Sequence, residues 1–156
     1  MTNINKNQSA KNQLYWVADN VIADDFPEVN SALRDPDGLL AIGGDLSHHR
    51  LLDAYRRGIF PWYSQGQPIL WWSPDPRCVL VPNELIISRS LKKSLKKNKF
   101  NVTFNQAFDL VIKGCAEPRK DSADTWITND IIQSYTSLHQ EGHAISVECW
   151  LNSELV

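Results

Sequence analysis

Apolar residues recur with helical spacing in two segments of the C-terminal half of the chain. The spacing i, i+3, i+4, i+7 is typical of an amphipathic helix, which packs its apolar stripe against a core. The first segment carries this stripe at Phe108, Val111, Ile112 and Cys115. The second carries it at Ile131, Ile132, Tyr135 and Leu138. We expect Asn105 and Thr128 to be the N-caps of these helices, and Gly142 to end the second.

Alternating apolar and polar residues predict strands in the same half of the chain. Every second residue is apolar in residues 100–104, FNVTF, as in a half-buried strand. Residues 145–151 alternate in the same way, and a turn at Asn152 and Ser153 then starts a return strand at residues 154–156. Such a short return strand leaves an apolar edge that natural chains protect, so we expect the C-terminal part of this lobe to be missing.

Turn residues divide the N-terminal half into shorter elements. Residues 43–45, Gly-Gly-Asp, form a turn, and Ser47 after them is a good N-cap for a helix through Arg57. Gly58 is the expected end of this helix, and the aromatic stretch RGIFPWYS, residues 57–64, overlaps that end. The helix therefore directs its C-terminus at a cluster of aromatic side chains.

Proline and paired tryptophans between Tyr63 and Pro76 exclude a regular helix there. The apolar run at residues 78–82, CVLVP, predicts a short buried strand. We place a lobe boundary at this point. The expected organisation is a disordered polar lead-in at residues 1–13, an N-terminal lobe at 14–76 and a second lobe at 77–156. The fold class is α+β.

Composition describes an ordinary globular protein with one unusual segment. The 156 residues have no apolar run long enough to span a bilayer and no signal peptide, so we expect a cytoplasmic protein with no membrane contact. The net charge is −2, but residues 85–99 hold six basic residues and no acid, leaving 10 basic against 18 acidic residues elsewhere. A basic patch on an acidic protein suggests a polyanionic partner on one face.

The basic segment predicts a helix capped by Ser88, with its cations on one side and Leu91 and Leu95 on the packed side. The cations span an arc of about 140° at 100° per residue. They are Arg89, Lys92, Lys93, Lys96 and Lys97. A solvated lysine face is one interpretation, and contact with phosphates is the other, since no acid supplies i,i+4 ion pairs. Charge alone does not separate RNA from DNA or an anionic membrane.

Six tryptophans in 156 residues indicate either a core or a binding surface. Any one of them is more often structural. Trp62 and Trp126 are the better candidates for binding, because each lies beside a turn and a helix end, where loops carry function. Exposed aromatic rings near cations bind unstacked bases, so the combination favours a single-stranded RNA end.

The remaining reactive residues carry little signal. Cys78, Cys115 and Cys149 are far apart in segments that look like core, and we expect them to be reduced and packed. The four histidines have no neighbouring ligand set, so no metal site is expected. Phosphate-binding, dinucleotide and serine-nucleophile motifs do not occur.

Several strings taken together resemble the bacterial leucyl/phenylalanyl-tRNA–protein transferases. The strings are DPDGLLAIGGDLS, LLDAYRRGIFPWYS, PILWWSPDPR, ISRSLKK, TWIT and LHQEGHAISVECW. They cover about residues 33–156 in the order of that family, and GIFPW with WWSPDPR is a specific signature. The resemblance implies a small N-terminal α/β lobe followed by the first part of a lobe similar to GNAT acyltransferases.

The resemblance also implies an activity. Leucine or phenylalanine would move from Leu-tRNA or Phe-tRNA to a protein whose N-terminal residue is Arg or Lys, marking that protein for degradation. The free amine attacks the ester carbonyl of the aminoacyl-tRNA, so the ester drives the reaction and no ATP, metal or other cofactor is implied. The expected state is a monomer. The rival hypothesis is a truncated, non-catalytic module that binds the aminoacylated end of tRNA.

Position by position, the resemblance assigns Trp62 and Trp126 to the terminal adenosine and aminoacyl group. Tyr55 and Tyr135 resemble their supporting aromatics, and the basic helix resembles the element that contacts the tRNA backbone. The catalytic polar residues proposed for the family would lie beyond the position of Val156, so no catalytic residue is assigned.

Overall fold

The computed structural model describes residues 14–19, 26–118 and 125–156, which form helices and strands in two units. Of the described residues, the first unit holds 14–19, 26–77, 118 and 125–130, and the second holds Cys78–Glu117 and Ile131–Val156. The expected α+β class is confirmed, because both helices and sheets are present. The lead-in predicted at residues 1–13 lies outside the described residues. Among the helices described, none has the length and hydropathy to cross a bilayer.

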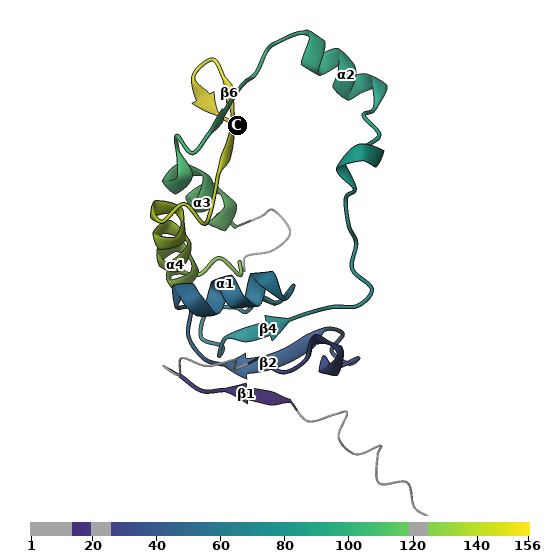
Figure 1. Ribbon diagram of the computed structural model, residues 1–156. Helices are drawn as coiled ribbons and strands as arrows, with labels where there is room; N and C mark the ends of the chain where they lie inside the picture. The colour runs from purple at the N-terminus through teal and green to yellow at the C-terminus, as the bar shows by residue number, and fades with distance from the viewer. Residues whose placement is uncertain (1–13, 20–25, 119–124) are drawn as a thin grey trace, which may run out of the picture. The chain divides into compact units, whose positions relative to one another are not determined.

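A four-stranded sheet with the order β1-β2-β4-β3 forms the body of the first unit. Figure 1 shows β1, β2 and β4 side by side. β1 pairs with β2 in parallel, and the other two pairings are antiparallel. The elements of this unit are β1 (Tyr15–Val17), η1 (Val29–Ser31), β2 (Leu39–Gly43), α1 (His48–Arg56), β3 (Phe60–Pro61) and β4 (Leu70–Trp72).

The core of this unit is built around Trp71, which is fully buried in the middle of β4. Phe26 meets its ring edge-to-face at a centroid distance of 4.7 Å. The indole N–H of Trp71 donates to the carbonyl of Gly43 at 2.9 Å, so its one polar group is paired. Leu51 of α1 is also fully buried, which fixes one face of the helix to this core.

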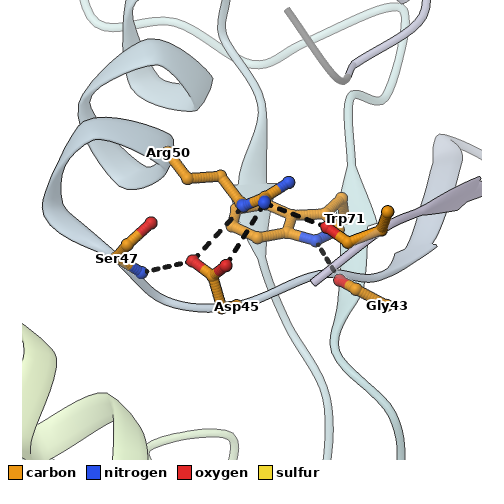
Figure 2. Close-up of polar contacts among 6 residues, drawn as sticks. Gly43, Asp45, Ser47, Arg50 and Trp71 are labelled. Carbon is orange, nitrogen blue, oxygen red and sulfur yellow. Dashed lines mark hydrogen bonds and ion pairs between the residues drawn. The ribbon is translucent and has the colours of Figure 1, made fainter. Parts of the chain in front are cut away.

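A partly buried ion pair holds the turn between β2 and α1 (Figure 2). The guanidinium of Arg50, only 3% exposed, donates to both carboxylate oxygens of Asp45 at 3.4 and 3.2 Å. A further bond from Arg50 reaches the carbonyl of Ala18 at 3.0 Å, which ties α1 to the end of β1. Asp45 also accepts from the backbone N–H of Ser47 at 2.9 Å. Ser47 is the N-cap residue as expected, although its own side chain makes no capping bond.

The second unit contains a three-stranded antiparallel sheet, β5-β6-β7, and three helices. Its elements are η2 (Pro82–Glu84), α2 (Arg89–Lys96), β5 (Asn101–Phe104), α3 (Phe108–Ala116), α4 (Asn129–Gln140, which begins at the unit boundary), β6 (Val147–Leu151) and β7 (Glu154–Leu155). The predicted hairpin is confirmed, since Asn152 and Ser153 adopt φ values of 51° and 68° between β6 and β7. Such positive φ values at both turn positions suit a two-residue hairpin loop.

Two local predictions in this unit are wrong. Residues 78–82 form no strand, and Val79 and Leu80 are 73% and 72% exposed. The N-cap of α3 is Ala107, not Asn105. The side chain of Asn105 instead accepts from the backbone N–H of Ser146 at 3.0 Å, so it joins the turn after β5 to the start of the hairpin.

The buried side of the second sheet is also opposite to the prediction. Phe104 on β5 and Val147 on β6 lie opposite each other and are 62% and 56% exposed. Thr103 and Glu148 form the neighbouring pair, and Glu148 is fully buried. Alternation along a strand defines two faces, but it does not say which face the rest of the unit covers.

Candidate functional site

The stretch RGIFPWYS alternates between the core and the surface of the first unit. Gly58 turns the chain at φ +74°, and the N–H of Ile59 then donates to the carbonyl of Ala54 at 2.8 Å. Ile59 and Pro61 are fully buried and Tyr63 is 6% exposed, whereas Trp62 is 57% exposed. The stretch is therefore both core and surface, and Trp62 is the side chain that it presents to the outside.

Backbone bonds to the neighbouring strand fix the position of Trp62. Its N–H donates to the carbonyl of Leu70 at 2.9 Å, and its carbonyl accepts from the indole of Trp72 at 2.7 Å. The rings of Trp62 and Trp72 are tilted by 56° with centroids 6.5 Å apart. An exposed indole on a backbone paired on both sides is a preorganised binding surface.

A cavity of about 400 Å³ lies beside Trp62, within the size range of small-ligand sites. It brings together three residues that the sequence singled out, Tyr55, Trp62 and Trp126. Its other described lining residues are Gly58, Ile59, Phe60, Pro61 and Arg77. A second cavity of about 370 Å³ shares Phe60 and Trp62 with the first.

The turn that carries Trp126 is anchored to the core of the same unit. The N–H of Thr128 donates to the carbonyl of Trp126 at 3.0 Å, and the Thr128 hydroxyl lies 3.3 Å from that of Tyr63. Burial raises the pKa of Tyr63, with a smaller opposing effect from the bond to Thr128 and a raising effect from the charge of Asp130. Tyr63 therefore stays a neutral phenol at neutral pH and acts as a structural support for the turn.

Arg77 is the lining residue that sequence reasoning missed. Among the described residues around the first cavity, it is the one that carries a full charge. Its Nη2 donates to the carbonyl of Gly58 at 2.6 Å, and its guanidinium carbon lies 5.3 Å from the centroid of the Phe60 ring. The cavity therefore combines aromatic walls with one positive group, a composition suited to an aromatic ligand that carries an anion.

The predicted basic helix is present as α2, and the hydroxyl of Ser88 caps it by accepting from the N–H of Leu91 at 3.2 Å. Every residue of α2 is exposed, including Leu91 at 50% and Leu95 at 59%, so the expected packing of its leucine side is wrong. Within the described ranges, no ion pair involves the basic residues of α2. Its cations are thus available to an anionic partner. Lys97, the last of the five predicted contacts, is the C-cap residue.

Tyr135, the fourth aromatic candidate, lies half-buried on α4 in the second unit. It is not among the described residues that line the cavity of the first unit. Its supporting role stays a prediction.

A buried carboxylate organises the second unit. Both oxygens of Glu148 accept hydroxyl bonds at 2.5 Å, one from Ser146 and the other from Thr103. The N–H groups of Gln106 and Ala107, just before α3, donate to it at 3.2 and 3.3 Å. The bond from Ser146 and then the bond from Thr103 hold the pKa of Glu148 below its ordinary value, with smaller lowering effects from the two backbone groups. The acid therefore links β5, β6 and the start of α3 in its ionised form.

The other reactive residues form no cluster. The described residues contain no group of three His, Cys, Asp or Glu side chains placed to hold a metal ion. All three cysteines are free, but Cys78 and Cys115 are exposed, so their expected packing is wrong. Cys149 on β6 is partly buried.

Comparison with known proteins relates both parts of the chain to one family. The sequence model of the leucyl/phenylalanyl-tRNA protein transferase family matches residues 79–156. The model of the N-terminal domain of these transferases matches residues 44–75. The second match contains most of the first cavity, including Tyr55 and Trp62.

Individual relatives agree with these matches. The chain is 57% identical over 143 residues to the leucyl/phenylalanyl-tRNA–protein transferase of Pseudomonas syringae pv. syringae, covering 92% of this chain and 62% of that protein. It is 60% identical over 131 residues to the Pseudomonas fluorescens transferase (84% and 58%). It is 61% identical over 131 residues to the Pectobacterium atrosepticum transferase (84% and 55%). The chain thus spans about three fifths of the length of these curated relatives.

Proposed function

The chain belongs to the leucyl/phenylalanyl-tRNA protein transferase family, and from that premise we propose that it transfers leucine or phenylalanine from aminoacyl-tRNA to the N-terminus of a protein. The observation that carries the proposal is the cavity of about 400 Å³ walled by Tyr55, Trp62 and Trp126 in a member of this family. The exposed rings of Tyr55 and Trp62, with the half-buried ring of Trp126, offer a stacking surface for a base that is not paired within a helix.

The reaction needs no redox step. The α-amine of the acceptor attacks the ester carbonyl that joins the amino acid to the ribose of the terminal adenosine. A C–N bond forms, the C–O bond of the ester breaks, the amine loses a proton and the ribose oxygen takes one up. Because the ester is already activated, holding the two reactants together supplies much of the rate.

Within this scheme, Trp62 and Trp126 hold the terminal adenosine and the aminoacyl group, and Tyr55 and Tyr135 support them. The support for this assignment is that Tyr55, Trp62 and Trp126 line one cavity, with Trp62 57% exposed. Trp62 sits on a backbone fixed by β4, so its ring meets the ligand without first having to be ordered.

The basic residues of α2 contact the phosphates of the tRNA without reading its sequence. The support is that these side chains are exposed and that the described residues place no acid in an ion pair with them. The contacts are made by Arg89, Lys92, Lys93 and Lys96 of α2 and by its C-cap residue Lys97.

Four further statements belong to the same proposal. The second unit is part of a GNAT-like acyltransferase fold, which its mixture of helices and an antiparallel sheet supports. The acceptor proteins begin with Arg or Lys. The protein acts in the cytoplasm, where tRNA and new protein substrates meet, and it acts as a monomer.

The test is transfer of radiolabelled leucine from Leu-tRNA to a peptide that begins with Arg, using the 156-residue chain. Transfer by the wild type and loss of transfer in Trp62→Ala support the proposal. Trp16→Ala is the matched control, because Trp16 is an equally large residue, 68% exposed, and is not among the residues lining either cavity. This variant retains wild-type transfer.

The assay also separates the rival function. Binding of Leu-tRNA without transfer identifies a module that holds the aminoacylated end and performs no chemistry. Absence of both transfer and tRNA binding contradicts both functions.

A further inference from the structure

We propose that Arg77 binds the phosphate on the 5′ side of the terminal adenosine, so that the cavity beside Trp62 recognises a nucleotide and not only a base. This inference rests on the proposed function, because it takes the adenosine end of tRNA as the occupant. It adds a charged determinant to a site otherwise described by its aromatic rings.

The guanidinium of Arg77 is held in place at the cavity. One N–H donates to the carbonyl of Gly58 at 2.6 Å, and the group lies 5.3 Å from the centre of the Phe60 ring. Gly58 and Phe60 line the same cavity. An arginine fixed by a carbonyl and an aromatic ring has lost side-chain freedom before the ligand arrives, so less is lost on binding.

This anchoring leaves most of the donor capacity of Arg77 unused. A guanidinium has five N–H groups, and the described residues accept one hydrogen bond from this one and form no ion pair with it. The side chain is exposed, so the remaining donors face solvent. A planar group with free donors matches the oxygens of a phosphate, which it can bind in a bidentate manner.

The chemistry of the ligand identifies the anion. In an aminoacyl-tRNA the carboxyl group of the amino acid is an ester and carries no charge. The phosphodiester on the terminal adenosine is therefore the nearest negative group to a base stacked in the cavity. A cation beside the aromatic walls then contacts backbone while the rings hold the base, the usual division of roles in single-strand recognition.

Gly58 contributes to this arrangement by leaving room for the guanidinium. A Cβ on residue 58 would lie 3.3 Å from Nη1 of Arg77, and the φ of +74° disfavours any other residue there. The end of α1 thus supplies both the carbonyl that orients Arg77 and the space in which it lies.

The experiment compares adenosine 5′-monophosphate with adenosine, because they differ only in the phosphate. Affinities of both are measured by equilibrium dialysis with the 156-residue chain, in the wild type, Arg77→Gln and Arg77→Lys. Arg56→Gln is the matched control, since Arg56 is an exposed cation near the end of α1 that is not among the residues lining the cavity. The ratio of the two affinities is internal to each variant, so partial unfolding lowers both values and leaves the ratio unchanged.

In the wild type we expect the monophosphate to bind about 10-fold more tightly than adenosine. This ratio is at the low end of the range for hydrogen bonds to a charged group, because Arg77 is exposed and solvent weakens the interaction. Arg77→Gln brings this ratio close to one, Arg77→Lys retains part of it, and Arg56→Gln keeps it. Equal binding of the two ligands by the wild type, or an unchanged ratio in Arg77→Gln, overturns the phosphate role while leaving the aromatic pocket in place. If the wild type binds neither ligand, the proposed adenosine site is wrong and the role of Arg77 falls with it.

Discussion

Replacing Trp62 with alanine should impair binding of the aminoacyl end more than it impairs folding. Loss of one base–aromatic stack costs about 1–3 kcal/mol of binding free energy, or about 5- to 150-fold in affinity. Trp62 is 57% exposed, so less than half of its surface is buried and the substitution removes only that buried part. About 100 Å² of buried apolar surface at about 25 cal/mol per Å² sets an upper bound of about 2.5 kcal/mol on the loss of unfolding free energy.

Trp71→Ala provides the contrast, because Trp71 is fully buried in the same sheet. Its removal should cost about 3–5 kcal/mol through the cavity it leaves, and the carbonyl of Gly43 loses its indole partner. The assay pairs urea denaturation followed by far-UV circular dichroism with anisotropy of fluorescently labelled Leu-tRNA. A Trp62→Ala variant that unfolds as easily as Trp71→Ala, or that stays folded and binds Leu-tRNA with unchanged affinity, would contradict a binding role for Trp62.

Three further predictions follow from other parts of the molecule. For five phosphate contacts, the log–log slope of tRNA affinity against salt should be roughly −3.5 to −4.5. Replacing Lys92, Lys93, Lys96 and Lys97 with alanine should make this slope shallower by about 3 for every tRNA sequence, and an unchanged slope argues for a solvated lysine face. Arg50→Met should lower the unfolding free energy by about 2–4 kcal/mol, because it removes the cationic partner of the partly buried Asp45. Arg56→Met, at an exposed position, is the control with a change within about 0.5 kcal/mol, and equal losses would show that the ion pair contributes nothing. Because the pKa of Glu148 is lowered in the folded protein, the ionised carboxylate contributes fully to the free energy of unfolding above the unfolded-state pKa near 4.5. This contribution is lost as pH falls through the folded-state pKa. Glu148→Gln should therefore flatten the acid limb of a curve of stability against pH, and an identical acid limb would contradict the role of the ionised carboxylate.

Local signals predicted the helices and turns well. Ser47 and Gly58 bracket α1 in the structure as the capping preferences indicate, and Ser88 caps α2 with its hydroxyl. The turn at Asn152 and Ser153 was equally visible, because both are common turn residues and Asn tolerates the positive φ that a tight hairpin requires. These features depend on a few adjacent residues, so the sequence alone is sufficient to find them.

The buried face of the second sheet was predicted wrongly, because burial depends on which other elements pack against a strand. The alternation of Ile145 and Val147 with Ser146 and Glu148 defines two faces, and the hydrophobic pattern predicts that the apolar face is the buried one. The structure buries Ser146 and Glu148, since the hydroxyls of Ser146 and of Thr103 on β5, with two backbone N–H groups of the turn after β5, satisfy the carboxylate. A hydrogen-bond network among distant residues overrides the hydrophobic pattern here.

The candidate site was predicted in part. Tyr55, Trp62 and Trp126 were singled out and line one cavity, although Trp126 is more than 60 residues away from Trp62 along the chain. Arg77 was missed because one arginine after a proline turn has no periodicity and no partner in sequence. Its relation to Gly58 and Phe60 appears only when the chain folds back from β4 to the end of α1.

The most direct test of the account is a double-mutant cycle between Trp62→Ala and removal of the terminal adenosine from tRNA. Both changes are measured alone and together by the affinity for the 156-residue chain. If the ring of Trp62 stacks on that adenosine, the two losses are not additive, and the coupling free energy is about 1–3 kcal/mol. Additive losses, with a coupling free energy near zero, would contradict the claim that this cavity binds the end of tRNA.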